Sequence, residues 1–222
     1  MERKIDAWDL PVRVSHWTIV VLVFAMWLTS ELGGEWLERH MVIGYVLLGV
    51  VLFRLIWGII GTRYARFTGF AWHPRGLLDH LRHFFSRTPS GYIGHNPMGT
   101  LSVVALLGLL LFQLGTGLFV DDDIYLRGPL ATWVDRDMRV ELTALHKEGF
   151  HVLLALIVLH VAAILYYRVV KRESLVLPMI TGKKRVPESS ADQAADLTGW
   201  WWRALIAALI SATTVYGIVN WT

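Results

Sequence analysis

Five long apolar runs constrain this chain more than any other feature. Each is close to the ~20 residues that an α-helix needs to cross the hydrocarbon core of a bilayer. They cover residues 14–32, 41–61, 98–120, 142–168 and 199–221. Lipid offers the backbone no hydrogen-bonding partner, so only helices or closed barrels cross it, and continuous runs of this length indicate helices. We therefore predict an all-α membrane protein.

The segments between the runs differ in charge. Segment 62–97 carries five arginines against one acid, Asp79, and segment 168–185 is also strongly basic. Segments 33–40 and 121–141 are acidic or mixed. Basic loops stay in the cytoplasm, which predicts a cytoplasmic N-terminus and places the acidic loops outside. Beside membrane spans, topology and anionic lipid explain the basic loops better than nucleic acid does, so no nucleic-acid partner is expected.

The chain has no cysteine, which excludes disulfides, iron–sulfur clusters and covalently attached c-type haem. Residues 1–13 read as a short polar lead-in to an uncleaved first span. Apolar residues at helical spacing in 74–86 predict a short interfacial helix. The polar stretch 183–198 reads as a flexible linker. We divide the chain into a domain at 1–185, a linker at 186–198 and an additional C-terminal helix at 199–222.

Four of the nine histidines lie in apolar helical context near the end of a run, where an imidazole is costly unless it has a partner. They are His16, His40, His146 and His160. A hydrogen bond to a neighbouring helix would explain any single one of them. His146 and His160 lie 14 residues apart on one run, so their side chains project within about 40° of each other and about 21 Å apart along the axis.

The expected depth of each histidine in the membrane then suggests which histidines pair. His16 and His160 lie near the inner ends of their runs, whereas His40 and His146 lie near the outer ends. The pattern predicts two pairs at two depths, suited to the axial ligands of two haem irons. Ligation by two histidines leaves a haem iron no open site, which favours electron transfer over oxygen chemistry.

The remaining histidines fit this pattern poorly. His151 lies about 140° round the helix from His146 and about 180° from His160, so we expect it to face another helix or lipid. The inner loop holds four more histidines, of which His80 and His83 share a helical face. Without an acidic or cysteine partner nearby, a metal site there is disfavoured. The four are His73, His80, His83 and His95.

Three basic residues are candidates for binding cofactor carboxylates. Arg54 lies within the second run, 14 residues after His40, and a buried arginine needs an anion such as a haem propionate, a quinone pocket or a lipid phosphate. Arg13 is a weaker candidate, because it also suits a helix-end anchor. Lys147 would serve an outer propionate. Several span glycines would let a flat macrocycle approach or would simply permit close helix packing: Gly44, Gly49, Gly108 and Gly115.

Three stretches resemble one family. They are "WDLPVRVSHW" within 7–17, "RHMVIGYVLLGVVLFRLIWG" at 39–58 and "LHKEGFHVLLALIVLHVAAILYYRVVKRESLVLPMITGKKR" at 145–185. Together they are similar to the prokaryotic cytochrome b561 family, which includes b-type subunits of nickel–iron hydrogenases and the gamma subunit of formate dehydrogenase. The resemblance covers about residues 5–185. The fifth run lies outside it, and Tyr166 and Tyr167 stand where a histidine is often seen.

The resemblance implies a four-helix bundle with two non-covalent haems b. It implies that His16 and His160 hold the inner haem and that His40 and His146 hold the outer one. It further implies electron exchange in the bacterial inner membrane, between quinone and a periplasmic c-type cytochrome or redox enzyme. The sequence leaves open whether two copies form a homodimer.

Two other functions compete with this interpretation. Some relatives oxidise superoxide at the outer face and reduce quinone, but the aspartate-rich loop 121–141 would repel that anion. The same acids suit docking of a basic protein partner. A haem-free transporter or structural membrane protein is the other alternative, and the colour of the purified protein separates it from the rest.

Overall fold

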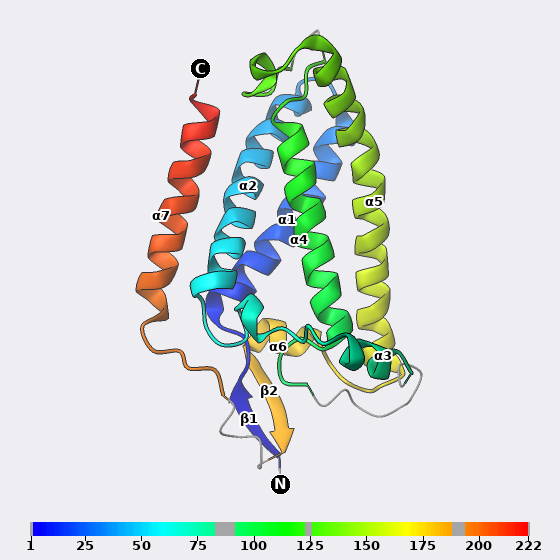
Figure 1. The fold of residues 1–222 in the computed structure, drawn as a ribbon, viewed down its shortest axis with the longest axis vertical. Helices are drawn as coiled ribbons and strands as arrows, with labels where there is room; N and C mark the ends of the chain where they lie inside the picture. Colours follow the sequence, from blue (N-terminus) through cyan, green and yellow to red (C-terminus); the bar gives the residue numbers. More distant parts are fainter. Residues whose placement is uncertain (1, 83–91, 123–125, 188–193, 222) are drawn as a thin grey trace. The chain divides into compact units, whose positions relative to one another are not determined.

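The computed structural model describes residues 2–82, 92–122, 126–187 and 194–221. Helices dominate the described chain, and two short strands pair near the N-terminus (Figure 1). In chain order the elements are β1 (Glu2–Asp6), α1 (Leu10–Leu32), α2 (Trp36–Ile60), the 3-10 turn η1 (Phe67–Gly69), α3 (Pro74–Arg82), α4 (Pro97–Gly117), the 3-10 turn η2 (Ala131–Trp133), α5 (Arg136–Val169), α6 (Val176–Thr181), β2 (Lys183–Pro187) and α7 (Trp200–Val219).

Five of the described helices are long and apolar enough to cross a membrane, which confirms the predicted fold class. They are α1, α2, α4, α5 and α7. Helix α5 begins six residues before the predicted span at 142, because Asp135 accepts a hydrogen bond from the Met138 backbone N–H and caps a polar first turn. Its 34 residues extend for about 51 Å, which exceeds the hydrocarbon thickness.

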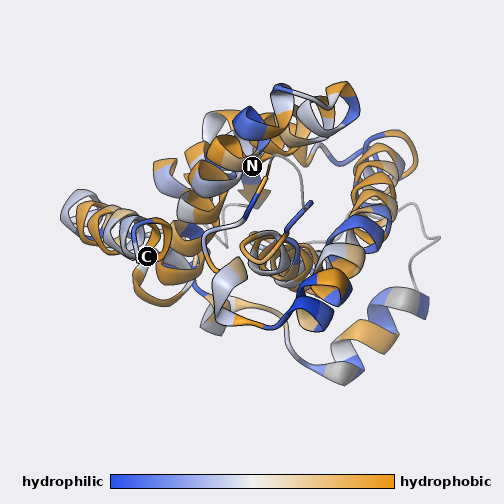
Figure 2. Cartoon of the chain, turned by 90° about the horizontal axis from the view of Figure 1, so that it is seen from above, coloured by the Kyte–Doolittle hydropathy of each residue, from blue (hydrophilic) through white to orange (hydrophobic). Residues whose placement is uncertain are grey.

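The long helices expose most of their apolar side chains. Only 11–33% of the residues in their apolar windows are buried within the chain. Figure 2 shows hydrophobic residues interspersed with less hydrophobic ones along these helices. An exposed apolar surface of this extent is unfavourable in water and suits a lipid environment.

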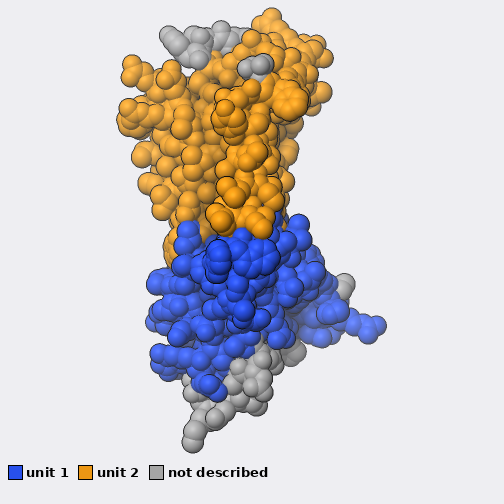
Figure 3. Space-filling model, turned by 90° about the vertical axis from the view of Figure 1, so that its left-hand side faces the viewer, with its two compact units in different colours: residues 1–14, 56–105, 156–204 blue, residues 15–55, 106–155, 205–222 orange. Residues whose placement is uncertain are grey.

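The chain groups into two compact units, coloured separately in Figure 3. Unit 1 contains residues 1–14, 56–105 and 156–204, and unit 2 contains 15–55, 106–155 and 205–222. Each of the five long helices contributes one part to each unit. The division therefore does not follow the order of the sequence.

A two-stranded antiparallel sheet in unit 1 corrects one expectation. Strand β1 pairs with β2 over five residues, from Glu2 opposite Pro187 to Asp6 opposite Lys183. Residues 183–187, expected to belong to a flexible linker, form a strand, and residues 2–6 of the polar lead-in form its partner. Side chains alternate along the strands, with Ile5 and Val186 buried while their charged neighbours are more exposed. The pairing joins segments about 180 residues apart, which local sequence patterns do not reveal.

Helix α3 confirms that residues 74–82 form a helix, and residues 83–86 of that prediction lie outside the described chain. Its place at the membrane interface stays a prediction.

A buried carboxylate joins the start of α1 to the end of α2, within unit 1. Asp9 is 2% exposed, and its Oδ1 accepts a hydrogen bond from the backbone N–H of Val12, which caps α1. The indole N–H of Trp57 donates to both carboxylate oxygens, at 3.2 and 3.0 Å. The Thr62 hydroxyl donates to Oδ2. One side chain thus satisfies buried donors from three places in the chain.

Candidate functional site

His40, in the second turn of α2, is held by two groups of α1. Its Nδ1 lies 3.0 Å from the backbone carbonyl of Met26 and 3.3 Å from the hydroxyl of Thr29. A carbonyl oxygen only accepts hydrogen bonds, so Nδ1 carries the proton and donates it. The lone pair of the imidazole is then on Nε2, which is the atom left to bind a metal.

His146, on α5, is held in the same way by α4. Its Nδ1 lies 2.9 Å from the carbonyl of Gln113 and 3.3 Å from the hydroxyl of Thr116. The Gln113 side-chain amide also donates to the His146 carbonyl at 2.6 Å. The imidazole therefore has the same tautomer as His40, with Nε2 available as a ligand.

The two threonines are themselves anchored. Thr29 donates its hydroxyl proton to carbonyls of its own helix, at Ala25 and Met26, and Thr116 does the same at Phe112 and Gln113. Each threonine follows the histidine's carbonyl acceptor by three residues, which places both on one helical face. Sequence reasoning missed these anchors, although a buried threonine in an apolar run was a usable signal.

The two rings face each other inside unit 2. The ring centroids of His40 and His146 are 6.4 Å apart, with 87° between the ring planes. Metal–imidazole bonds are about 2.0–2.1 Å long, so two imidazoles on opposite sides of one ion have centroids roughly 6 Å apart. The separation of the two rings is therefore close to that of two imidazoles bound to one ion.

Gly117 leaves room for the His146 ring. A Cβ atom at this position would lie 3.0 Å from Cε1 and 3.3 Å from Nδ1 of His146, closer than ordinary contacts. We expect Gly117→Ala to tilt the imidazole and to weaken retention of the haem at this pair. Haem content and the optical spectrum of the purified variant measure this effect.

Gly217→Ala is the matched control, because a Cβ there meets nothing within 4 Å. This control should keep the wild-type haem content. Equal haem content and equal spectra in both alanine variants would show that the space beside His146 does not matter.

The other predicted pair is described only in part. His160 is in unit 1, where its Nδ1 lies 3.1 Å from the hydroxyl of Ser102 on α4. His16 is in unit 2, where its ring makes an edge contact with Trp17 at 5.1 Å between centroids. Because the two histidines belong to different units, their pairing stays a prediction.

The three candidate basic residues differ in their surroundings. Arg54 is 6% exposed within α2, as expected for a guanidinium that needs an anion. Arg13 donates to the backbone carbonyl of Ile180, which agrees with the helix-anchor alternative. Lys147 is exposed on α5. Their roles toward a cofactor stay predictions.

The remaining histidines make other contacts. The side chain of His151 is 72% exposed, and it lies 3.5 Å from Glu148 rather than beside His146. His80 contacts Tyr167, and His95 packs against Trp8 and Phe70. Among the described residues, no group of three or more His, Asp or Glu side chains could hold a metal ion. His83 lies outside the described chain.

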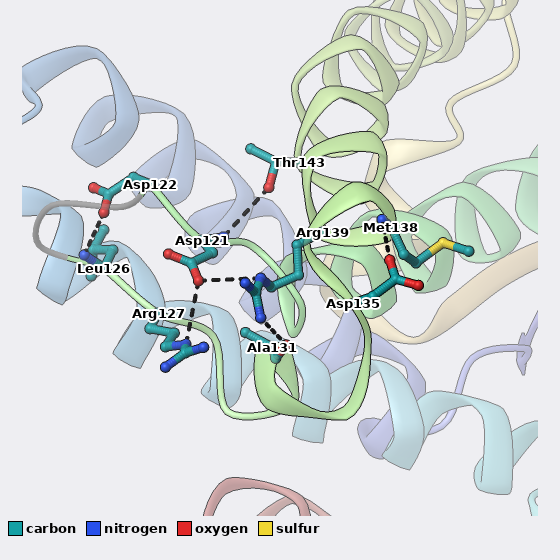
Figure 4. A network of polar contacts seen from close by, with 9 residues as sticks. All are labelled: Asp121, Asp122, Leu126, Arg127, Ala131, Asp135, Met138, Arg139 and Thr143. Atoms are coloured by element: carbon teal, nitrogen blue, oxygen red, sulfur yellow. Dashed lines mark hydrogen bonds and ion pairs between the residues drawn. The ribbon is translucent and has the colours of Figure 1, made fainter.

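In the loop between α4 and α5, two aspartates interact with groups of the same loop or of α5 (Figure 4). The Asp121 carboxylate lies 3.3 Å from Arg127 and 3.4 Å from Arg139, and only 12% of its side chain is exposed. Asp122 accepts the backbone N–H of Leu126. These contacts weaken the expectation that the acids here steer a basic partner.

Asp135, Asp137 and Glu141 stay exposed at the start of α5, and Asp135 also caps that helix. Asp123 lies outside the described residues.

The five long apolar helices define a multi-pass membrane protein, and the rings of His40 and His146 lie close together within its unit 2. The chain belongs to the prokaryotic cytochrome b561 family, whose profile matches residues 7–182. Membership of this b-type cytochrome family implies haem b as the cofactor and electron transport as the process.

Similar proteins carry related names. A "Probable Ni/Fe-hydrogenase B-type cytochrome subunit" of Azotobacter vinelandii is 24% identical over 86% of this chain and 92% of its own length. A protein of the same name from Rhodobacter capsulatus is 27% identical over 82% of this chain and 81% of its own length. The "Probable Ni/Fe-hydrogenase 1 B-type cytochrome subunit" of Escherichia coli K12 is 26% identical over 53% of this chain and 63% of its own length. No solved structure matches the chain significantly.

Proposed function

We propose that this protein carries electrons across the bacterial cytoplasmic membrane through two haems b. His40 and His146 bind one haem, and His16 and His160 bind the other. The observation that carries the proposal is the His40–His146 pair, with 6.4 Å between the ring centroids and both Nδ1 atoms hydrogen-bonded to backbone carbonyls.

The protein's part in this function is ligation and positioning. A bound haem supplies a one-electron carrier. The carbonyls of Met26 and Gln113 fix the ring orientation and increase the basicity of each ligating nitrogen. Helix α5 supplies a ligand to each haem, since His146 and His160 share one face of it. With two histidines on each iron, neither centre keeps an open position for oxygen.

The charge of the loops supports an orientation and a partner. The basic segments 62–97 and 168–185 favour a cytoplasmic N-terminus. The acidic or mixed segments 33–40 and 121–141, which adjoin His40 and His146 in the sequence, are then expected on the periplasmic side. The names of the relatives suggest that a nickel–iron hydrogenase docks there, and we propose that quinone exchanges electrons on the His160 side.

Sealed proteoliposomes test transmembrane electron transfer. Ferricyanide is trapped inside and dithionite is added outside, and neither ion crosses lipid freely. We expect rapid loss of ferricyanide absorbance with wild-type protein and slow loss with His146→Ala or with protein-free vesicles. A rate equal to that of protein-free vesicles in the wild type would contradict the proposal.

A further inference from the structure

A hydrogen-bonded row of polar side chains leads from the surface into unit 1, outside the histidine pairs. His80 on α3 is half-buried, and its Nε2 lies 2.7 Å from the hydroxyl of Tyr167 on α5. Tyr167 is 3% exposed. The side-chain amide of Asn96 donates to the same hydroxyl at 2.8 Å. The row thus joins an imidazole within reach of water to a buried phenol.

Asn96 fixes the order of these hydrogen bonds. Its Oδ1 accepts the backbone N–H of Gly99 at 2.7 Å and so caps α4. Its Nδ2 therefore points to Tyr167, and the phenol oxygen accepts that bond. The phenol proton can then be donated to His80, or His80 can donate to the phenol, so one proton can lie on either side of the 2.7 Å contact.

The surroundings of His80 favour its neutral form, mainly through burial. Burial lowers the pKa of His80, and the ammonium of Lys171 lowers it further, while Glu173 acts in the opposite direction. Glu173 forms an ion pair with Lys184 at 2.9 Å. The ring of Tyr92 packs 6.2 Å from that of His80. On α3 itself, Asp79 and Arg82 pair with each other. A neutral imidazole near pH 7 is able to accept a proton.

The row ends on the face of α5 that carries a predicted haem ligand. Tyr167 follows His160 by seven residues, which is close to two turns, so the two side chains share a face about 10.5 Å apart along the axis. The hydroxyl of Ser102 lies beside His160 in the same unit. Polar groups therefore lie both next to Tyr167 and next to His160 in unit 1.

Quinone chemistry requires such a path. Oxidation of one quinol by two ferric haems gives one quinone, two ferrous haems and two protons, and the reverse reaction consumes two protons. The hydrocarbon core supplies no proton acceptor, so protons must pass between the bound quinone and water through side chains or ordered water.

We propose that His80 and Tyr167 relay protons between water and a quinone bound on the His160 side of the protein, with Asn96 positioning the phenol. The inference rests on the proposed exchange of electrons with quinone. In quinol oxidation, the phenol passes its proton to His80, takes one from the quinol, and His80 releases a proton to water. Reduction of quinone uses the same steps in reverse.

Two variants remove the relay with small changes in shape. Tyr167→Phe deletes the hydroxyl and keeps the ring, and His80→Ala deletes the imidazole. Stopped-flow mixing with a short-chain quinol follows haem reduction, and a pH-indicator dye follows proton release in the same experiment. We expect both rates to fall about tenfold or more in each variant. Added imidazole should restore both rates in His80→Ala and in no other variant.

Tyr166→Phe and His73→Gln are matched controls. Tyr166→Phe removes a phenol hydroxyl next to position 167, and His73→Gln removes an imidazole just before α3, the helix that carries His80. His73 is exposed. Both controls should retain wild-type rates. Dithionite, which delivers electrons without protons, should reduce the haems of every variant at the wild-type rate. Haem content and spectra should also be unchanged.

The outcomes separate the relay from the proposed function. Wild-type rates of quinol-driven haem reduction and proton release in both relay variants would overturn the relay. A slow His80→Ala variant that imidazole does not restore would also overturn it, since the histidine would then have only a structural role. If quinol failed to reduce the wild-type haems, quinone exchange itself would be wrong.

Discussion

In His146→Ala, we expect the haem content to fall from two haems per chain to one. The substitution removes one of two axial ligands, and a non-covalent haem with a single histidine at this site is poorly retained. His40→Ala should have the same effect, because the two imidazoles face each other at 6.4 Å. A pyridine haem assay gives the content, and redox titration shows which component is lost.

His151→Ala provides the control for these variants. His151 is on the same helix, five residues from His146, but its side chain is 72% exposed and contacts Glu148. Both haems should remain in this variant. His40→Ala and His146→Ala should lose the same redox component and keep the other one. His16→Ala and His160→Ala should lose that other component. Loss of one component in both His40→Ala and His160→Ala would show that the pairing by depth is wrong.

Asp9→Ala should produce a large loss of stability. The substitution leaves three buried donors without their acceptor: the Val12 amide, the Trp57 indole and the Thr62 hydroxyl. Unsatisfied buried donors cost about 1–3 kcal/mol each, so we expect a decrease of roughly 3 kcal/mol or more in the free energy of unfolding. Thermal unfolding in detergent, followed by tryptophan fluorescence, measures the change.

Asp79→Ala is the control for this experiment. Asp79 forms an exposed ion pair with Arg82 at 3.4 Å, and exposed pairs contribute within about 1 kcal/mol. The control should unfold within a few degrees of the wild type. Similar unfolding temperatures for Asp9→Ala and Asp79→Ala would mean that the buried carboxylate does not hold α1 to α2.

The sequence was sufficient to predict the membrane helices, because long apolar runs have few other solutions. It also predicted that His40 and His146 meet, since depth in the membrane limits which imidazoles can reach each other. The angular argument placed His151 correctly on the outside. These predictions succeeded because each depends on helical periodicity or on membrane depth, both of which are local properties of the sequence.

Contacts between distant segments were not predictable in this way. The threonine and carbonyl anchors of the two histidines depend on the rotation of α1 and α4 about their own axes. The ion pairs of Asp121 with Arg127 and Arg139 depend on the path of a loop. The His16–His160 pair and the roles of Arg54, Arg13 and Lys147 stay predictions.

The β1–β2 pairing has a consequence for synthesis. Strand β1 leaves the ribosome before its partner, Lys183–Pro187, which follows about 180 residues later. At about 5–20 residues per second, β1 waits roughly 10–40 s with an unpaired edge. During that interval Ile5 has no strand to cover it. This end of the molecule therefore closes only after α1, α2, α4 and α5 have all been made, and any chain interrupted before residue 187 exposes a free strand.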